Sequence, residues 1–178
     1  MREQVLAVKF DVDPIARDRK VLYGDEKIIV EDKKGNKITL ADHKRLYPYK
    51  LDNTVTCTVD TTLRSFSFVI EKDYVWNGAD IPRLLWCFVG SKDAPEFKEP
   101  SLIHDYMLEF KFEILEKSLH NEIEIKDYRR ISSLTFRQSL KDNGTKTVKS
   151  NIMSGSVQFF QVVFNGKEWV KKDEPPRY

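Results

Sequence analysis

The sequence contains few cysteines and no long hydrophobic run. Only Cys57 and Cys87 occur among its 178 residues, and they do not have the close spacing of a CxxC motif. Both lie in apolar or strand-like segments, so we expect two reduced, buried thiols rather than a disulfide or a metal site. No apolar stretch is long enough for a signal peptide or a membrane span, so we expect a protein that is made and folded in the cytoplasm.

An excess of one charge sign is also missing. The chain has 30 Lys and Arg against 28 Asp and Glu, a formal net charge of +2, which gives no general attraction to nucleic acid or to an anionic membrane. Basic pairs such as Lys33-Lys34 and Arg129-Arg130 are scattered, and a solvated surface explains them more simply than nucleic-acid binding does. The hydrophobic share of 40% excludes a disordered chain and predicts a packed core.

The first part of the chain has the alternation and the turn residues of antiparallel strands. Residues 1–12 predict a strand whose inner face carries Leu6, Val8, Phe10 and Val12. Two hairpins are expected after it. The first spans 27–40, with Gly35 and Asn36 in its turn, and the second joins 54–59 to 65–70. Their strand edges could dock other chains or could simply cover the core.

Helical patterns dominate the rest of the chain. After a strand end at 74–76 and a short helix at 84–89, we expect helices over about 101–118, about 125–142 and about 147–162. Strands first and helices later indicate a single α+β domain with segregated layers. It divides into an N-terminal β-hairpin region at 1–65, a helical core at 66–170 and an extended tail at 171–178.

The helix expected at 101–118 contains the adjacent pair His104-Asp105. At about 100° per residue the two side chains border a stripe that also contains Leu108 and Phe112, so they could face one pocket. His104 could then act as a general base, with Asp105 as a ligand of a hard cation such as Ca²⁺. Alternatively, the pair could hydrogen-bond to the backbone and to an arginine of a neighbouring helix and fix the packing.

The helix expected at 125–142 offers that arginine. Arg129, Ser133, Arg137 and Leu140 recur at near-helical spacing. Arg129 is therefore the expected partner of the Asp105 carboxylate in a charge-assisted pair. A solvated position is at least as favoured for Arg137. Asp80, in the loop before Pro82, could join Asp105 around a metal ion or could cap the following short helix.

Three blocks of this sequence, taken in order, resemble a family of unknown function that is common in tailed phages and prophages. The blocks are Trp76-Asn77-Gly78-Ala79-Asp80-Ile81-Pro82-Arg83, then His104-Asp105-Tyr106, then Arg129 to Gly144. They are similar to the family's DGASIPR, HDYLY, R-x-x-x-D-x-x-F and L-x-x-x-G patterns over about residues 66–170. The spacing is also similar to that of secreted calcium-dependent phospholipases, in which a His-Asp pair on one helix meets an aspartate from the next.

This sequence departs from the family pattern at four places. Asp80 stands where the family usually has serine, Asn77 where an aspartate is frequent, and Leu108 at the second tyrosine of HDYLY. Ser133 stands where the second helix of the family has its aspartate. The resemblance therefore implies a His-Asp site that lacks its third carboxylate, with Arg129 retained.

Two functions follow from these observations. The first is a structural or accessory protein of a tailed bacteriophage virion, in the neck or tail, assembled in the host cytoplasm and bound to other virion proteins or to copies of itself. The alternative is a small hydrolase acting on lipid or cell envelope, with His104 as the general base and Asp105 and Asp80 as ligands of Ca²⁺. The incomplete acid set favours the first function and makes His104-Asp105 a structural node.

Overall fold

The computed structural model describes residues 3–78, 95–120 and 122–163. In this part of the chain, antiparallel strands come first and helices follow, which confirms the predicted single α+β domain. The main sheet has the order β1-β6-β7 and consists of Val5–Phe10, Val55–Thr61 and Ser65–Ile70. A second sheet, β2-β5-β8, consists of Ala16–Asp18, Tyr49–Leu51 and Val75–Trp76. The hairpin β3-β4 consists of Ile29–Glu31 and Lys37–Thr39.

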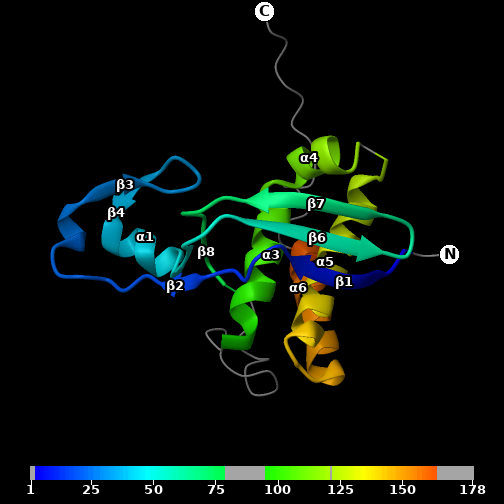
Figure 1. The fold of residues 1–178 in the computed structure, drawn as a ribbon. Coiled ribbons are helices and arrows are strands. Elements are labelled where there is room, and N and C mark those ends of the chain that lie inside the picture. Colours follow the sequence, from blue (N-terminus) through cyan, green and yellow to red (C-terminus); the bar gives the residue numbers. More distant parts are fainter. Residues whose placement is uncertain (1–2, 79–94, 121, 164–178) are drawn as a thin grey trace, which may run out of the picture.

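Helices cover one face of the main sheet (Figure 1). They are α3 (Lys98–Glu109), the short α4 (Lys111–Glu113) with the π-helical turn η4 (Ile114–Ser118), α5 (Ile125–Asp142) and α6 (Thr147–Val163). The 3-10 turn η3 (Pro95–Phe97) leads into α3. Helix α5 packs against α3, α6 and β1. None of the described helices is both long and apolar enough to cross a membrane.

The core lies between the main sheet and α3 and α5. Side chains of β6 and β7 alternate between buried and more exposed positions, as expected for strands with one covered face. The buried set from sheet and helices includes Val55, Cys57, Val59, Phe66, Phe68, Ile70, Leu102, Ile103, Met107, Tyr128 and Ile131. Cys57 is a free, buried thiol, as predicted, and burial raises its pKa. Cys87 lies outside the described residues.

Two sequence-based expectations about local structure were wrong. Leu6 and Val12 were expected on the inner face of the first strand, but both are exposed. A bulge between Val5 and Ala7 shifts the register and turns Val5 inward, and Val12 lies beyond the end of β1. The helix expected at about 101–118 begins earlier, at Lys98, and α3 ends at Glu109. The backbone leaves helical geometry at Phe110, whose ring stacks on Tyr106 with ring centroids 4.5 Å apart.

A segment that the sequence did not predict in full projects beside the main sheet (Figure 1). We call residues 19–48 the arm. The arm contains η1 (Asp25–Lys27), the β3-β4 hairpin and α1 (Leu40–Leu46). The hairpin was predicted, whereas α1 was not. Thr39 caps α1, since its hydroxyl accepts a hydrogen bond from the Asp42 amide at 3.1 Å.

Polar contacts around Asp25 stabilise the arm. The Asp25 carboxylate is buried and accepts hydrogen bonds from the Leu22 amide at 2.6 Å and from Lys44 Nζ at 2.8 Å. These bonds join the start of η1 to α1. Ala41 is the one buried apolar residue among the residues of the arm, which are all described. The arm therefore has no hydrophobic core of its own, and the contacts of Asp25 stabilise it instead.

The arm is expected to lose its order in acid. The Leu22 amide, and then Lys44, lower the pKa of Asp25 below its ordinary value of 3.8. This contribution to stability is therefore full above pH 3.8 and is lost as the pH falls through the lowered pKa. Amide hydrogen exchange should show Asp25→Asn loosening the arm at pH 6 and flattening its pH dependence. The exposed Glu26→Gln, in the same 3-10 turn, is the control, and equal effects of the two variants would contradict this role.

Candidate functional site: the cleft beside α3

Helix α3 directs His104 and Asp105 toward different surroundings. The His104 side chain is 9% exposed, and its ring lies 5.3 Å from the ring of Phe136 on α5. The Asp105 side chain is 21% exposed and lines a cleft on the side of α3 that faces the arm. The two side chains still meet at their edges, with 3.7 Å between His104 Nδ1 and Asp105 Oδ1. His104 is thus part of the α3–α5 packing, while Asp105 is part of a surface.

The cleft has a volume of about 370 Å³ and lies between the turn of the β3-β4 hairpin and α3. Its floor is aromatic, and its walls carry both signs of charge. The lining residues are Lys33, Lys34, Tyr47, Tyr74, Trp76, Asn77, Asp105, Leu108, Glu109 and Lys111. Helical geometry allowed His104 and Asp105 to face one pocket, provided that it lay against Leu108 and Phe112. Leu108 and Asp105 do line the cleft, whereas His104 does not.

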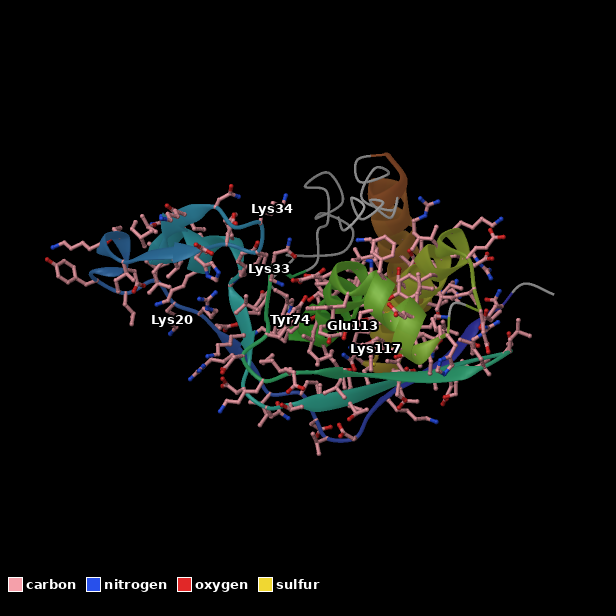
Figure 2. The ribbon with its side chains drawn as sticks, turned by 90° about the horizontal axis from the view of Figure 1, so that it is seen from above. Lys20, Lys33, Lys34, Tyr74, Glu113 and Lys117 are labelled. Atoms are coloured by element: carbon pink, nitrogen blue, oxygen red, sulfur yellow. The ribbon has the colours of Figure 1, made fainter. Side chains whose placement is uncertain are left out.

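A polar network at the cleft ties the arm to α3. Lys33, from the hairpin turn, forms an ion pair with Glu109, and Tyr74 Oη donates a hydrogen bond to the same carboxylate at 2.8 Å. Lys33 Nζ also lies 4.1 Å from the centroid of the Tyr74 ring, a cation–π arrangement. Figure 2 shows Lys33 and Lys34 at the edge of the arm that faces Tyr74. The network fixes the hairpin turn over the cleft.

The environment of Tyr74 favours its neutral form. Burial raises the pKa of its phenol strongly, and the Asp105 and Glu109 carboxylates add to this effect. Tyr74 therefore stays protonated and donates to Glu109 over the whole physiological range. The phenol is thus a hydrogen-bond donor to Glu109 at the edge of this cleft.

The cleft could hold a hard cation only with ligands beyond those that the structure describes. Asp105 and Glu109 stand one helical turn apart on its wall. Within residues 3–78, 95–120 and 122–163, no three His, Cys, Asp or Glu side chains come together as metal ligands. Asp80, the second predicted ligand, lies outside the described residues, as does Arg83. The proposed Ca²⁺ site therefore stays a prediction.

Helix α5 places Ser133 in the interior, where the family resemblance led us to expect an acid. Ser133 is buried, and its hydroxyl donates to the Arg129 carbonyl at 3.2 Å. The Ser133 carbonyl accepts a hydrogen bond from the Ser154 hydroxyl of α6 at 2.9 Å. Arg129 is half-buried on the same helix, and its pairing with Asp105 stays a prediction. The small side chain at position 133 thus permits close packing of α6.

Sequence reasoning assigned no role at this site to Lys33, Glu109 or Gly78, which shape this region. Lys33 and Glu109 meet across 76 positions of the chain, and no local pattern signals such a pair. Gly78 has a φ of +86°, and a Cβ there would lie 2.8 Å from Cε2 of Tyr49. The one available signal for Gly78 was its place next to Trp76-Asn77 in the family-like block.

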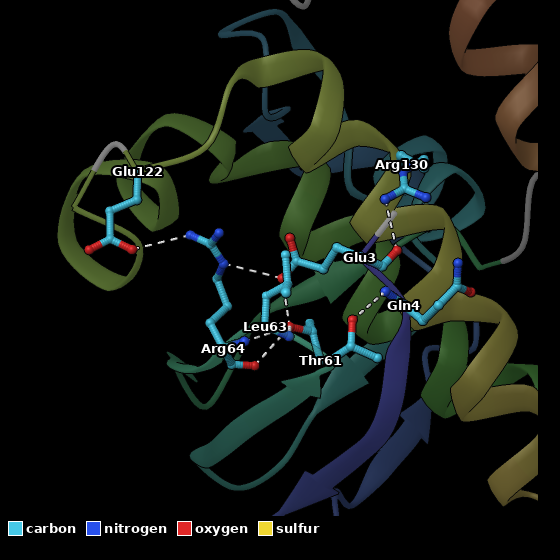
Figure 3. A network of polar contacts seen from close by, with 8 residues as sticks. Glu3, Gln4, Thr61, Leu63, Arg64, Glu122 and Arg130 are labelled. Carbon is cyan, nitrogen blue, oxygen red and sulfur yellow. Dashed lines mark hydrogen bonds and ion pairs between the residues drawn. The ribbon is translucent and has the colours of Figure 1, made fainter. Parts of the chain in front are cut away.

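A second network holds the start of the described chain against α5 (Figure 3). Buried Glu3 accepts hydrogen bonds from Thr61 Oγ1 at 2.6 Å and from Arg64 Nε at 3.2 Å, while Arg130 donates to the Glu3 carbonyl at 2.7 Å. Arg64 also binds Glu122 at 3.1 Å. These contacts join β1, the β6-β7 turn and α5. We assign them a structural role, since Arg64 pairs with both Glu3 and Glu122 and Arg130 binds the backbone of Glu3.

Comparison with known proteins gave one match. The model of a family described as "Protein of unknown function (DUF1353)" matches residues 50–157, more than half of the chain. No curated protein and no solved structure matched. The matched segment contains the main helices and the cleft wall on α3, whereas β1 and the arm precede it.

Proposed function

The chain belongs to the DUF1353 family, and on that premise we propose that it is a structural or accessory protein of a tailed bacteriophage virion. It acts in the neck or tail through protein-protein contacts made by the arm, after assembly in the host cytoplasm. The phage context is supported by the motif resemblance around Trp76-Asn77-Gly78 and His104-Asp105. The arm precedes the segment that matches the family. It is therefore the part of this chain that would bind a partner specific to this protein, while the matched segment supplies the fold common to the family.

One observation carries the proposal: the arm exposes large apolar side chains. Tyr23 is fully exposed, and Leu22 and Ile29 are 62% and 60% exposed. Monomeric proteins seldom gather such side chains on one small projection, and gathered ones mark interaction sites. The exposed set on the arm is Val21, Leu22, Tyr23, Ile28, Ile29 and Leu46.

The proposal is tested by mass spectrometry of purified virions from the phage or prophage that encodes the chain. We expect the protein in stoichiometric amounts, and we expect Leu22→Ser combined with Tyr23→Ser to reduce its incorporation at least about tenfold by removing apolar contact area. Leu63→Ser is the matched control, because Leu63 is 59% exposed on the β6-β7 turn, away from the arm. Virions that lack the protein would refute the proposal.

The alternative function, a small hydrolase of lipid or cell envelope, is favoured by one observation. Asp105 lines a cleft and lies 3.7 Å from the His104 imidazole. A general base must reach the proton that it abstracts, directly or through one water. His104 packs against Phe136 and does not line the cleft. The hydrolase is therefore the weaker of the two proposals.

A further inference from the structure

The outer edge of β3 carries backbone groups that are available for another strand. In the described part of the chain, β3 pairs with β4 alone. The Asp32 amide donates to the Asn36 carbonyl at 2.9 Å, and the Leu40 amide donates to the Ile28 carbonyl at 2.7 Å. Residues 28, 30 and 32 thus turn their backbone groups toward β4. Since these groups alternate along an antiparallel strand, Ile29 and Glu31 turn theirs outward.

The side chains along this edge are exposed and alternate in a self-complementary order. Lys27 ends η1, Ile29 is 60% exposed, and Glu31 ends β3. Within the described residues, neither Lys27 nor Glu31 takes part in an ion pair. A positive charge, an apolar side chain and a negative charge therefore follow one another at intervals of two residues. An edge strand of this kind is a template for pairing with another chain.

We propose that the partner at this edge is a second copy of the chain, paired antiparallel about Ile29. The two Ile29 residues then lie opposite each other, and each Lys27 lies opposite the Glu31 of the other copy. The outward backbone groups of Ile29 face each other and form the hydrogen-bonded pair at the two-fold axis. The two hairpins together make one four-stranded sheet.

Other registers that use the outward backbone groups are unfavourable. Centring on Val30 places Ile29 opposite Glu31, and centring on Glu31 places two carboxylates opposite each other. Like charges directly opposite on neighbouring strands are destabilising, whereas opposite charges stabilise the pair. The register about Ile29 is thus selected by both charge and hydrophobicity. This inference deepens the proposed function, because it names the partner of one edge of the arm.

Sedimentation velocity of the purified chain tests the inference. The strands are short, so we expect a monomer–dimer equilibrium with a Kd on the order of micromolar, followed from about 1 to about 500 μM protein. Lys27→Glu and Glu31→Lys, each alone, place two like-charged pairs across the dimer and should weaken it roughly tenfold or more. An equimolar mixture of these two variants should associate again, because every facing pair then has opposite signs. The double variant Lys27→Glu/Glu31→Lys should also dimerise.

The matched control is Lys20→Glu, which reverses an exposed charge of the arm outside β3 and β4. It should dimerise like the parent chain. A chain that is monomeric at all concentrations, or variants whose mixture fails to associate, would overturn the inference. Mass spectrometry of purified virions measures separately whether the protein is incorporated, which tests the virion role. A monomeric chain that is present in virions would thus refute self-pairing alone, and a dimer that is absent from virions would refute the virion role alone.

Discussion

A Gly78→Ala variant should lose about 2–4 kcal/mol of unfolding free energy, because the added methyl group introduces both backbone strain and a steric clash. The φ of +86° at Gly78 is strained for any residue with a Cβ, and that Cβ would lie 2.8 Å from Cε2 of the Tyr49 ring. Tyr49 is buried and packs against Trp76, with ring centroids 5.5 Å apart. The ring therefore has little room to move. Urea unfolding of the two proteins measures the loss.

Gly144 provides the matched control for this prediction. Its φ is +81°, close to that of Gly78, but no heavy atom lies within 4 Å of the position of its Cβ. Gly144→Ala should therefore cost about 1–2 kcal/mol, the conformational cost alone. Equal losses for the two variants would show that the Tyr49 ring does not restrict the residue at position 78.

A His104→Ala variant should be destabilised by about 2–4 kcal/mol, because it leaves a cavity between α3 and α5. The His104 residue is 7% exposed, and its ring packs on Phe136, which is itself buried. Asp105→Ala is the comparison within the same pair. Its side chain is more exposed and lines the cleft, so we expect a loss below about 1 kcal/mol. Thermal and urea unfolding measure both.

The His104→Ala variant also distinguishes a structural role of His104 from a catalytic one. Removal of a catalytic side chain often leaves stability unchanged or raises it, because active sites sacrifice stability for function. If His104 is a packing residue, His104→Ala lowers stability and leaves any hydrolytic background and any calcium-dependent melting shift as they were. An unchanged stability together with the loss of a calcium-dependent hydrolytic activity would establish the hydrolase instead.

Much of the fold could be predicted because its main elements have strong local patterns. The alternation in β6 and β7 and the periodicity of α5 predicted those elements nearly to the residue. The arm was harder, since α1 has seven residues and little apolar periodicity. Its order depends on the Thr39 cap and on the contact of Asp25 with Lys44, 19 positions away. Short helices gain their stability from such contacts rather than from propensity.

The candidate site was predictable only in part. Helical geometry predicted that Asp105 and Leu108 share a face, and both line the cleft. The same geometry allowed His104 to join them, but the packing of Phe136 determines where the imidazole lies. Likewise, the ion pair of Lys33 with Glu109 depends on how the hairpin turn meets α3. The position of the imidazole and the formation of the ion pair depend on tertiary packing. The sequence of a single helix therefore does not predict them.

The central claim is that the His104 ring contributes to the packing of α3 on α5 through its contact with Phe136, and a double-mutant cycle tests it most directly. The cycle compares His104→Ala, Phe136→Leu and the double variant by urea unfolding. For rings 5.3 Å apart, we expect a coupling energy of about 0.5–1.5 kcal/mol. Losses that simply add, with no coupling beyond the error of measurement, would contradict the claim.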